Sequence, residues 1–198
     1  MKEVWNNRYS ENEFMYGTEA NEFLKEELAK IPKGKILFLG EGEGRNAVFA
    51  ATLGWKVDAV DYSEAGKGKA DMLASKNNVT LNYTVADILE HPIQNESYDA
   101  VALIYIHVNE ETKPILHKKV IDALKPKGKI IIEAFEKEQL KYNSGGPKDA
   151  DLLYDLQSIA EDFIDFEYEK LSKEVVELKE GLLHQGEAVV VRFVGVKV

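Results

Sequence analysis

Apolar residues in this chain form short continuous runs, and the stretches between the runs carry apolar residues at helical spacing. The run Ile36–Leu39 is typical of a strand buried on both faces of a sheet. Further strands and the helices between them are expected at residues 56–61, 79–85, 98–108 and 129–135, and at 45–53, 64–76 and 110–124. Strands that alternate with helices predict an α/β fold with a mostly parallel, doubly wound sheet and helices on both faces.

The pattern changes toward the end of the chain. A loop, a helix and two further strands are expected at residues 142–149, 151–163, 166–178 and 188–196, with a turn region at 179–187. The last two strands lie too close together for a crossover helix. They therefore form a hairpin, and one of them runs antiparallel to the rest of the sheet.

The N-terminal residues 1–17 are rich in aromatic side chains but have little periodicity. They form either an ordered arm that packs on the domain or a lid over a small-molecule site. Residues 18–31 have helical spacing, with Thr18 as the candidate cap. We expect one domain, residues 1–198, in which residues 1–31 are an N-terminal arm and helix.

Composition narrows the choice of partners. The 198 residues carry a formal net charge of −10 and no long basic run, which argues against nucleic acid. The chain has no cysteine, so disulfides and thiolate chemistry are excluded, and its four histidines show no metal-ligand spacing. The polar first residues do not form a signal peptide, and no apolar run approaches the roughly 20 residues of a membrane span. We expect a cytoplasmic protein without a metal.

The candidate chemistry begins in the stretch Gly40–Asn46, directly after the first strand. Its glycines Gly40, Gly42 and Gly44 are spaced G-x-G-x-G, whereas pyrophosphate-binding folds use G-x-G-x-x-G. Glu41 and Glu43 lie inside the turn and would repel a pyrophosphate. A ligand with a positive centre and no phosphate suits the turn better, and S-adenosylmethionine is such a ligand.

Two acidic residues follow later strands. Asp61 ends the second strand about 20 residues past the glycines, where an acid can bind both ribose hydroxyls, with Tyr62 next to it. Asp61 could instead cap the following helix, but Ser63 fills that role as well. Asp87 and Ile88, past the third strand, suit an adenine amino group and its ring; the alternative is that Asp87 only caps a loop.

These motifs together resemble the successive cofactor motifs of class I S-adenosylmethionine-dependent methyltransferases, as does the turn Leu124–Lys129. Within that superfamily, three stretches resemble the branch related to tellurite-resistance methyltransferases: Gly40–Ala47, Tyr142–Asp149 and Glu180–Gly186. Tellurium chemistry does not follow from this resemblance. The resemblance implies S-adenosylmethionine as cofactor and a seven-stranded sheet of order 3-2-1-4-5-7-6, with strand 7 antiparallel.

One position departs from the superfamily. An acidic residue usually stands two residues before the first motif glycine, and this chain has Phe38 there. We expect Glu41 to take over the role of holding the amino end of the cofactor. The expected cofactor-binding residues are thus Gly40, Glu41, Gly42, Gly44, Asn46, Asp61, Tyr62, Asp87 and Ile88.

The acceptor side is expected at the carboxyl ends of the strands, where ligands bind in parallel sheets. Tyr142, His184 and His107 are the candidate catalytic residues. His184 would orient the acceptor or take its proton, and His107 is the second choice. The alternatives are that His184 bonds its own turn and that His107 packs at the end of its strand.

The resulting expectation is a methyltransferase for a small molecule with a thiol, hydroxyl, amine or metalloid oxyanion acceptor. Few insertions decorate the core, so a macromolecular substrate is disfavoured, and a monomer or homodimer is expected. The alternatives are an NAD(P)-dependent oxidoreductase on a similar sheet and a non-catalytic S-adenosylmethionine-binding protein.

Overall fold

The strands of the computed structural model, which describes residues 2–198, form one seven-stranded sheet of order β3-β2-β1-β4-β5-β7-β6. The strands are β1 (Lys35–Leu39), β2 (Lys56–Asp61), β3 (Asn82–Val85), β4 (Tyr98–Ile104), β5 (Leu124–Phe135), β6 (Phe166–Glu180) and β7 (His184–Lys197). β7 runs antiparallel to β5, whereas β1–β2, β2–β3 and β4–β5 are parallel pairs. The predicted strand order and the antiparallel last strand are confirmed.

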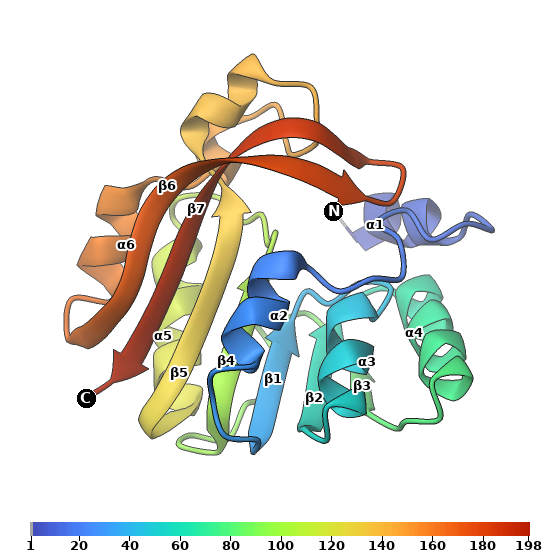
Figure 1. Cartoon of the computed structure of the whole chain (residues 1–198), viewed down its shortest axis with the longest axis horizontal. Helices are drawn as coiled ribbons and strands as arrows, with labels where there is room; N and C mark the ends of the chain where they lie inside the picture. The colour runs from blue at the N-terminus through green and yellow to red at the C-terminus, as the bar shows by residue number, and fades with distance from the viewer. Residues whose placement is uncertain (1) are drawn as a thin grey trace. The chain divides into compact units, whose positions relative to one another are not determined.

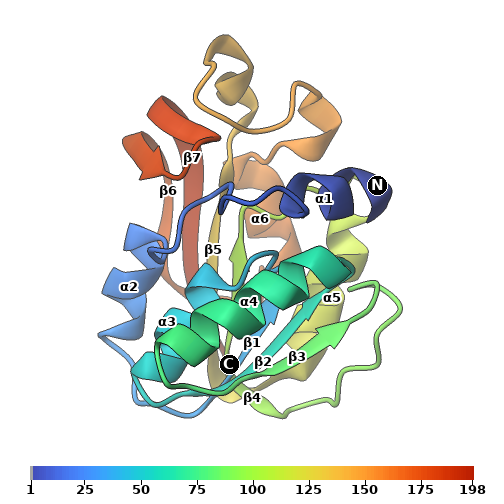
Figure 2. The same cartoon turned by 90° about the vertical axis from the view of Figure 1, so that its right-hand side faces the viewer.

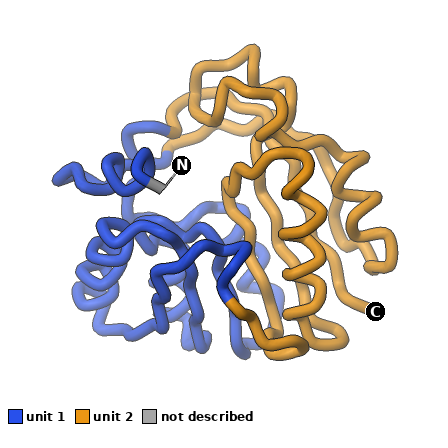
Figure 3. The backbone as a smooth tube through the Cα atoms, turned by 180° about the vertical axis from the view of Figure 1, so that it is seen from behind, with its two compact units in different colours: residues 1–91, 180–183 blue, residues 92–179, 184–198 orange. Residues whose placement is uncertain are grey.

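The chain divides into two compact units (Figure 3). The first comprises residues 1–91 together with 180–183, and the second comprises residues 92–179 and 184–198. Each unit is described by itself below.

The first unit contains β1 to β3 and four helices. The helices are α1 (Lys2–Tyr9), α2 (Glu22–Leu28), α3 (Arg45–Thr52) and α4 (Glu64–Lys76). Figure 2 shows α3 and α4 on the same face of the three strands. A small apolar cluster joins these two helices through Val48, Leu73 and Ala74. The four apolar residues of β1 are almost fully buried, as their continuous run predicts.

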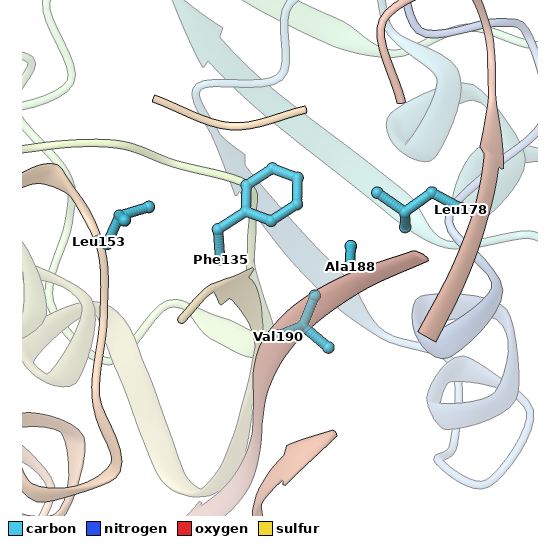
Figure 4. Close-up of a cluster of buried hydrophobic side chains, with 5 residues drawn as sticks. All are labelled: Phe135, Leu153, Leu178, Ala188 and Val190. Atoms are coloured by element: carbon cyan, nitrogen blue, oxygen red, sulfur yellow. The ribbon is translucent and has the colours of Figure 1, made fainter. Parts of the chain in front are cut away.

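The second unit contains β4 to β7 with α5 (Lys113–Ala123) and α6 (Leu156–Asp162) (Figure 1). Short 3₁₀ helices span Lys137–Lys141 and Ala150–Leu152. One part of its core is a cluster around Phe135, drawn in Figure 4, which also contains Leu153, Leu178, Ala188 and Val190. Residues of β5, β6 and β7 thus bury one another's side chains at this end of the strands.

The N-terminal segment differs from the expectation in one boundary and adds one helix. Lys2–Tyr9 is helical although its apolar residues show little periodicity. The next helix begins at Glu22, not at Thr18, because Asn21 is its cap: the Asn21 side-chain oxygen accepts the Leu24 N–H at 3.0 Å.

The C-terminal hairpin is longer than expected. β6 continues to Glu180 and β7 begins at His184, so only three residues make the turn. His184 is therefore the first residue of a strand and not a turn residue. Continued pairing of the two strands satisfies the backbone groups that the expected turn would have left exposed.

We predict that Gly44→Ala lowers the free energy of unfolding by about 2 to 4 kcal/mol. Gly44 has a φ of +89°, and an added Cβ would lie 2.4 Å from the Cβ of Ala70 on α4. Urea denaturation followed by circular dichroism measures the change.

Gly68→Ala on α4 is the matched control. An added Cβ there meets nothing within 4 Å, and alanine favours a helix by about 0.5 to 1 kcal/mol over glycine. Equal losses in the two variants would contradict the close contact between the glycine turn and α4.

Candidate functional site

The turn after β1 is shaped by three glycines and fixed by two neighbouring strands. Gly40, Gly42 and Gly44 have backbone φ values of +64°, +61° and +89°, which residues with a Cβ rarely adopt. The Gly42 N–H donates to Oδ2 of Asp61 at 3.0 Å, and the hydroxyl of Tyr83 donates to the Gly42 carbonyl at 2.6 Å. β2 and β3 therefore hold the middle of the turn in place.

Asp61 lies buried beside this turn at the end of β2. Its Oδ1 accepts the Ser63 N–H at 2.9 Å, and burial raises the pKa of its carboxyl, against the opposing effect of these backbone hydrogen bonds. Ser63 is the cap of α4, since its hydroxyl accepts the Gly66 N–H at 3.0 Å. Asp61 is thus not needed as the helix cap, as the sequence suggested.

Asp87 follows β3, which pairs with β2 so that Asp61 lies opposite Val85. Asp87 is exposed, and its Oδ1 accepts the Leu89 N–H at 2.8 Å, so it makes the local turn that was the alternative interpretation. Its neighbour Ile88 is buried. Tyr62 is partly buried, and burial is the main cause that raises its pKa to about 12.

Glu41 lies buried in the turn and serves the helix that follows it. Its Oε1 accepts the N–H groups of Asn46 at 2.9 Å and Ala47 at 2.7 Å, in the first turn of α3. Gly44 occupies the cap position without a side chain, so Glu41 replaces the missing cap. Burial raises the pKa of the Glu41 carboxyl to about 8.

Glu43 binds the N-terminal arm, residues 2–17. Its two carboxylate oxygens accept the N–H groups of Met15 at 3.2 Å and Tyr16 at 3.3 Å, and Oε1 pairs with Lys69 Nζ at 2.7 Å. Both side chains of this ion pair are almost completely buried. Glu43 is therefore engaged with the protein's own backbone.

The arm lies directly on the glycine turn. A Cβ added to Gly42 would be 2.5 Å from the Tyr9 hydroxyl oxygen, and Tyr9 is buried. Asn6 Oδ1 accepts the Ser63 hydroxyl at 3.0 Å and the Ala65 N–H at 3.1 Å, at the start of α4. The arm is thus ordered and packed on the candidate site, and its opening as a lid stays a prediction.

The hairpin tip, residues 180–183, fastens the other end of the arm. Glu180 Oε2 pairs with Arg45 at 2.9 Å, and Glu180 Oε1 accepts the side-chain amide of Asn21 at 3.0 Å. The Leu182 N–H donates to the Met15 carbonyl at 2.8 Å. Asn46 helps here as well, because its Oδ1 accepts the Asn21 N–H at 2.9 Å.

In the second unit, an aromatic cluster brings two of the predicted catalytic residues together. His107 stacks on Phe135 with ring centroids 5.7 Å apart, and His184 meets Phe135 edge-on at 5.2 Å. Tyr105 lies 4.7 Å from both Phe135 and His184. Tyr142 follows a 3₁₀ helix, and within residues 2–198 no ring contact joins it to this cluster.

His107 is neutral at physiological pH. Its pKa is lowered to about 4, chiefly by burial and to a smaller extent by the nearby His184 and Lys113, against the opposing effect of a hydrogen bond to Leu152. That bond joins Nδ1 to the Leu152 carbonyl at 3.4 Å. Because a carbonyl only accepts, Nδ1 carries the proton and Nε2 is the basic nitrogen.

Comparisons with known proteins show what the sequence and the fold are similar to. Residues 36–128 match the family model described as a methyltransferase domain. This segment, nearly half of the chain, is similar to the class I S-adenosylmethionine-dependent methyltransferases. A probable S-adenosyl-L-methionine-dependent methyltransferase, TehB of Haemophilus influenzae, is 30% identical over 88 residues, which cover 43% of this chain and 30% of that protein.

A further curated relative is also a methyltransferase, and a further solved structure has the same fold. The ubiquinone biosynthesis O-methyltransferase of Rickettsia akari is 31% identical over 117 residues, 58% of this chain and 45% of that protein. The chain thus spans less than half the length of these curated relatives. A solved structure from work on thioacetal formation in echinomycin biosynthesis aligns with a TM-score of 0.80 at 15% identity, over 100% of this chain and 91% of that one.

The TehB crystal structure from Haemophilus influenzae aligns over 100% of this chain and 67% of its own, with a TM-score of 0.75 and 19% identity. This alignment shows the shared fold, and the predicted likeness to the tellurite-resistance branch is confirmed by the sequence match to TehB. In residues 2–198, no helix is long and apolar enough to cross a membrane.

The residues around the turn fit the cofactor of this family, S-adenosylmethionine. Asp61 supplies a carboxylate that can accept hydrogen bonds, and the glycines leave three positions of the turn without a side chain of their own. The two buried cations nearby, Arg45 and Lys69, are already paired with Glu180 and Glu43. The site therefore favours a cationic ligand without phosphates.

Several contributors escaped the sequence interpretation. Tyr83 and Tyr9 hold or cover the glycine turn, Asn6 bonds the start of α4, and Tyr105 contacts His184. Tyr83 and Tyr105 look like ordinary strand residues in the sequence. Only the aromatic content of the arm was a usable signal.

We predict that His107 lowers the stability of the wild-type protein in acid relative to a variant that lacks this histidine. The folded-state pKa of about 4 lies below the ordinary value of 6.5, so unfolding takes up a proton and the free energy of unfolding falls as the pH drops from about 6.5 to about 4. A His107→Gln variant lacks this contribution, so in urea titrations at pH 7, 6 and 5 its free energy of unfolding should rise relative to that of the wild type as the pH falls.

His91→Gln serves as the control, because it also removes one histidine. The raised pKa of Glu41 acts in the opposite sense, lowering stability as the pH rises toward about 8, but it is common to all three proteins. Parallel curves for wild type and His107→Gln would contradict a neutral, buried His107.

Proposed function

We propose that the protein transfers the methyl group of S-adenosylmethionine to a small-molecule acceptor with a thiol, hydroxyl, amine or metalloid oxyanion nucleophile. The observation that carries this proposal is the buried Asp61 carboxylate bonded to the Gly42 N–H beside a turn whose neighbouring cations are neutralised. The names of the relatives, TehB and a ubiquinone biosynthesis O-methyltransferase, support the reaction class.

The cofactor residues would divide their roles along the turn and the strand ends. Asp61 would accept the ribose hydroxyls, and Asp87, Ile88 and Tyr62 would surround the adenine. Gly40, Gly42 and Gly44 would let the backbone approach the methionine part of the cofactor. Glu41 and Asn46 border that part, and Glu41 is the candidate for the cofactor's amino group.

The bound cofactor supplies a methyl group already activated by its sulfonium. The chain then has to align the acceptor, exclude water and receive a proton where the acceptor is a thiol, hydroxyl or amine. A neutral imidazole can receive that proton. We assign this role to His184, with His107 as second candidate and Tyr142 as an acceptor-lining residue.

A nicotinamide-dependent oxidoreductase is a weaker candidate. Its pyrophosphate would need free N–H groups and cations, but Glu41 occupies the first N–H groups of α3, and Lys69 is paired with Glu43. A non-catalytic S-adenosylmethionine-binding protein would keep the same turn and lack methyl transfer. A methyl-transfer assay therefore distinguishes this alternative from the proposed enzyme.

We predict that S-adenosylhomocysteine binds in titration calorimetry and that NAD does not. Asp61→Asn should weaken S-adenosylhomocysteine binding about 10- to 100-fold, because a hydrogen bond to a charged group contributes about 1.5 to 3 kcal/mol. Asp58→Asn on the same strand, which loses a surface pair with Lys35, should bind as the wild type does. Binding of NAD, or equal effects of the two variants, would refute this cofactor assignment.

We predict that His184→Ala loses at least about 100-fold in kcat on an acceptor found by a labelled-methyl screen of thiols, hydroxylated aromatics, amines and metalloid oxyanions. His107→Ala should have a smaller effect, and His91→Ala should turn over as the wild type does. Full turnover by His184→Ala with an unchanged pH profile would remove His184 from the mechanism. No turnover with any acceptor would favour the non-catalytic alternative.

A further inference from the structure

Tyr105 has an unusual backbone for a large side chain. It directly follows β4 and has a φ of +54°, in the left-handed region that bulky residues avoid. Such conformations persist only where surrounding contacts hold them, and they concentrate at functional sites. The contacts that hold Tyr105 therefore need an explanation.

A single residue, Glu133 on β5, binds Tyr105 at both ends. The Tyr105 N–H donates to the Glu133 carbonyl at 2.8 Å, and the Tyr105 hydroxyl donates to Glu133 Oε1 at 2.7 Å. The backbone and the tip of the ring are thereby tied to one residue of the neighbouring strand. The direction of the Tyr105 ring is set by the position of the Glu133 carboxylate.

Glu133 is itself immobilised. Its side chain is 1% exposed, and its second oxygen, Oε2, accepts Arg192 Nε on β7 at 2.6 Å. Arg192 Nη1 in turn donates to Glu174 on β6 at 2.7 Å. A buried charge pair is a poor source of stability but a good source of a fixed geometry. The chain of contacts therefore runs across three strands to the Tyr105 hydroxyl.

The ring that this chain fixes lies against the proposed acceptor histidine. Tyr105 stacks on Phe135 at 4.7 Å with an angle of 29°, and its ring meets that of His184 at 4.7 Å and 75°. Rotation of the Tyr105 ring would have to displace His184 or Phe135, because the Tyr105 ring packs directly against both of these rings.

We propose that Glu133 is a positioning residue: acting through the Tyr105 hydroxyl, it fixes the orientation of the His184 imidazole and with it the alignment of the methyl acceptor. This inference rests on the methyl transfer proposed above. Glu133 touches neither cofactor nor acceptor in this proposal, so its removal should change the reaction only through Tyr105 and His184.

The test uses the full chain labelled with ¹³C-histidine, whose four imidazoles can be assigned by single substitutions. Tyr105→Phe keeps the ring and removes only the hydroxyl that Glu133 accepts. We expect the His184 C–H resonances to shift and kcat to fall about ten-fold, as small misalignments of reacting groups do. Glu133→Gln keeps an acceptor oxygen and should lie between Tyr105→Phe and the wild type.

Tyr168→Phe is the matched control, because the Tyr168 hydroxyl also donates one hydrogen bond, to the Ala160 carbonyl at 2.9 Å, and its ring packs on Phe193. It should leave the His184 resonances and kcat unchanged. If Tyr105→Phe leaves both as in the control, the inference is wrong. If the wild type neither binds S-adenosylhomocysteine nor transfers methyl groups, the proposed function fails, while the imidazole spectra still decide whether Glu133 orients His184.

Discussion

The need to satisfy buried backbone N–H groups around one glycine turn is the constraint on which the first unit depends. Buried donors without partners are costly, so the turn and the segments packed on it need acceptors. Asp61 accepts the Gly42 N–H, Glu41 accepts two N–H groups of α3, and Glu43 accepts two from the arm. Three acidic residues within or beside the turn are thus first of all structural, because each accepts backbone N–H groups that would otherwise be buried without a partner.

Electrostatic balance follows from the same arrangement. Two buried cations lie near these acidic residues. Lys69 pairs with Glu43, which binds the arm, and Arg45 pairs with Glu180 at the hairpin tip. Removing one partner of such a pair leaves a buried charge, so the pairs tie the arm and the hairpin tip to the turn. Because both cations are already paired, a ligand that carries a sulfonium and an ammonium suits the turn better than a diphosphate does. The family match of residues 36–128 agrees with this choice.

The sequence was sufficient for features that depend on neighbours along the chain. The buried run of β1, the glycine spacing, the cap Ser63 and the hairpin of β6 and β7 all follow from local pattern, and the sheet order followed from the family resemblance. Contacts between distant residues were out of reach. Nothing near Tyr83 indicates that its hydroxyl holds Gly42. The packing of Tyr9 on the glycine turn and on α4 could not be seen from α1 either, whose apolar residues show little periodicity. Asn21 displaced Thr18 as cap because Asn46 and Glu180 hold Asn21 in place.

The neutral state of His107 bears on the different roles that we propose for the two histidines of the aromatic cluster. His107 and His184 share Phe135 as a neighbour, and two protonated imidazoles so close together would repel each other. Burial and the neighbouring positive charges keep the pKa of His107 at about 4, so His107 does not compete for a proton near neutral pH. The proton-accepting role in the proposed reaction therefore falls to His184. A fixed Tyr105 ring supports this proposed role, because it keeps the His184 imidazole in one orientation. Catalysis by a base depends on such alignment with the proton of the acceptor.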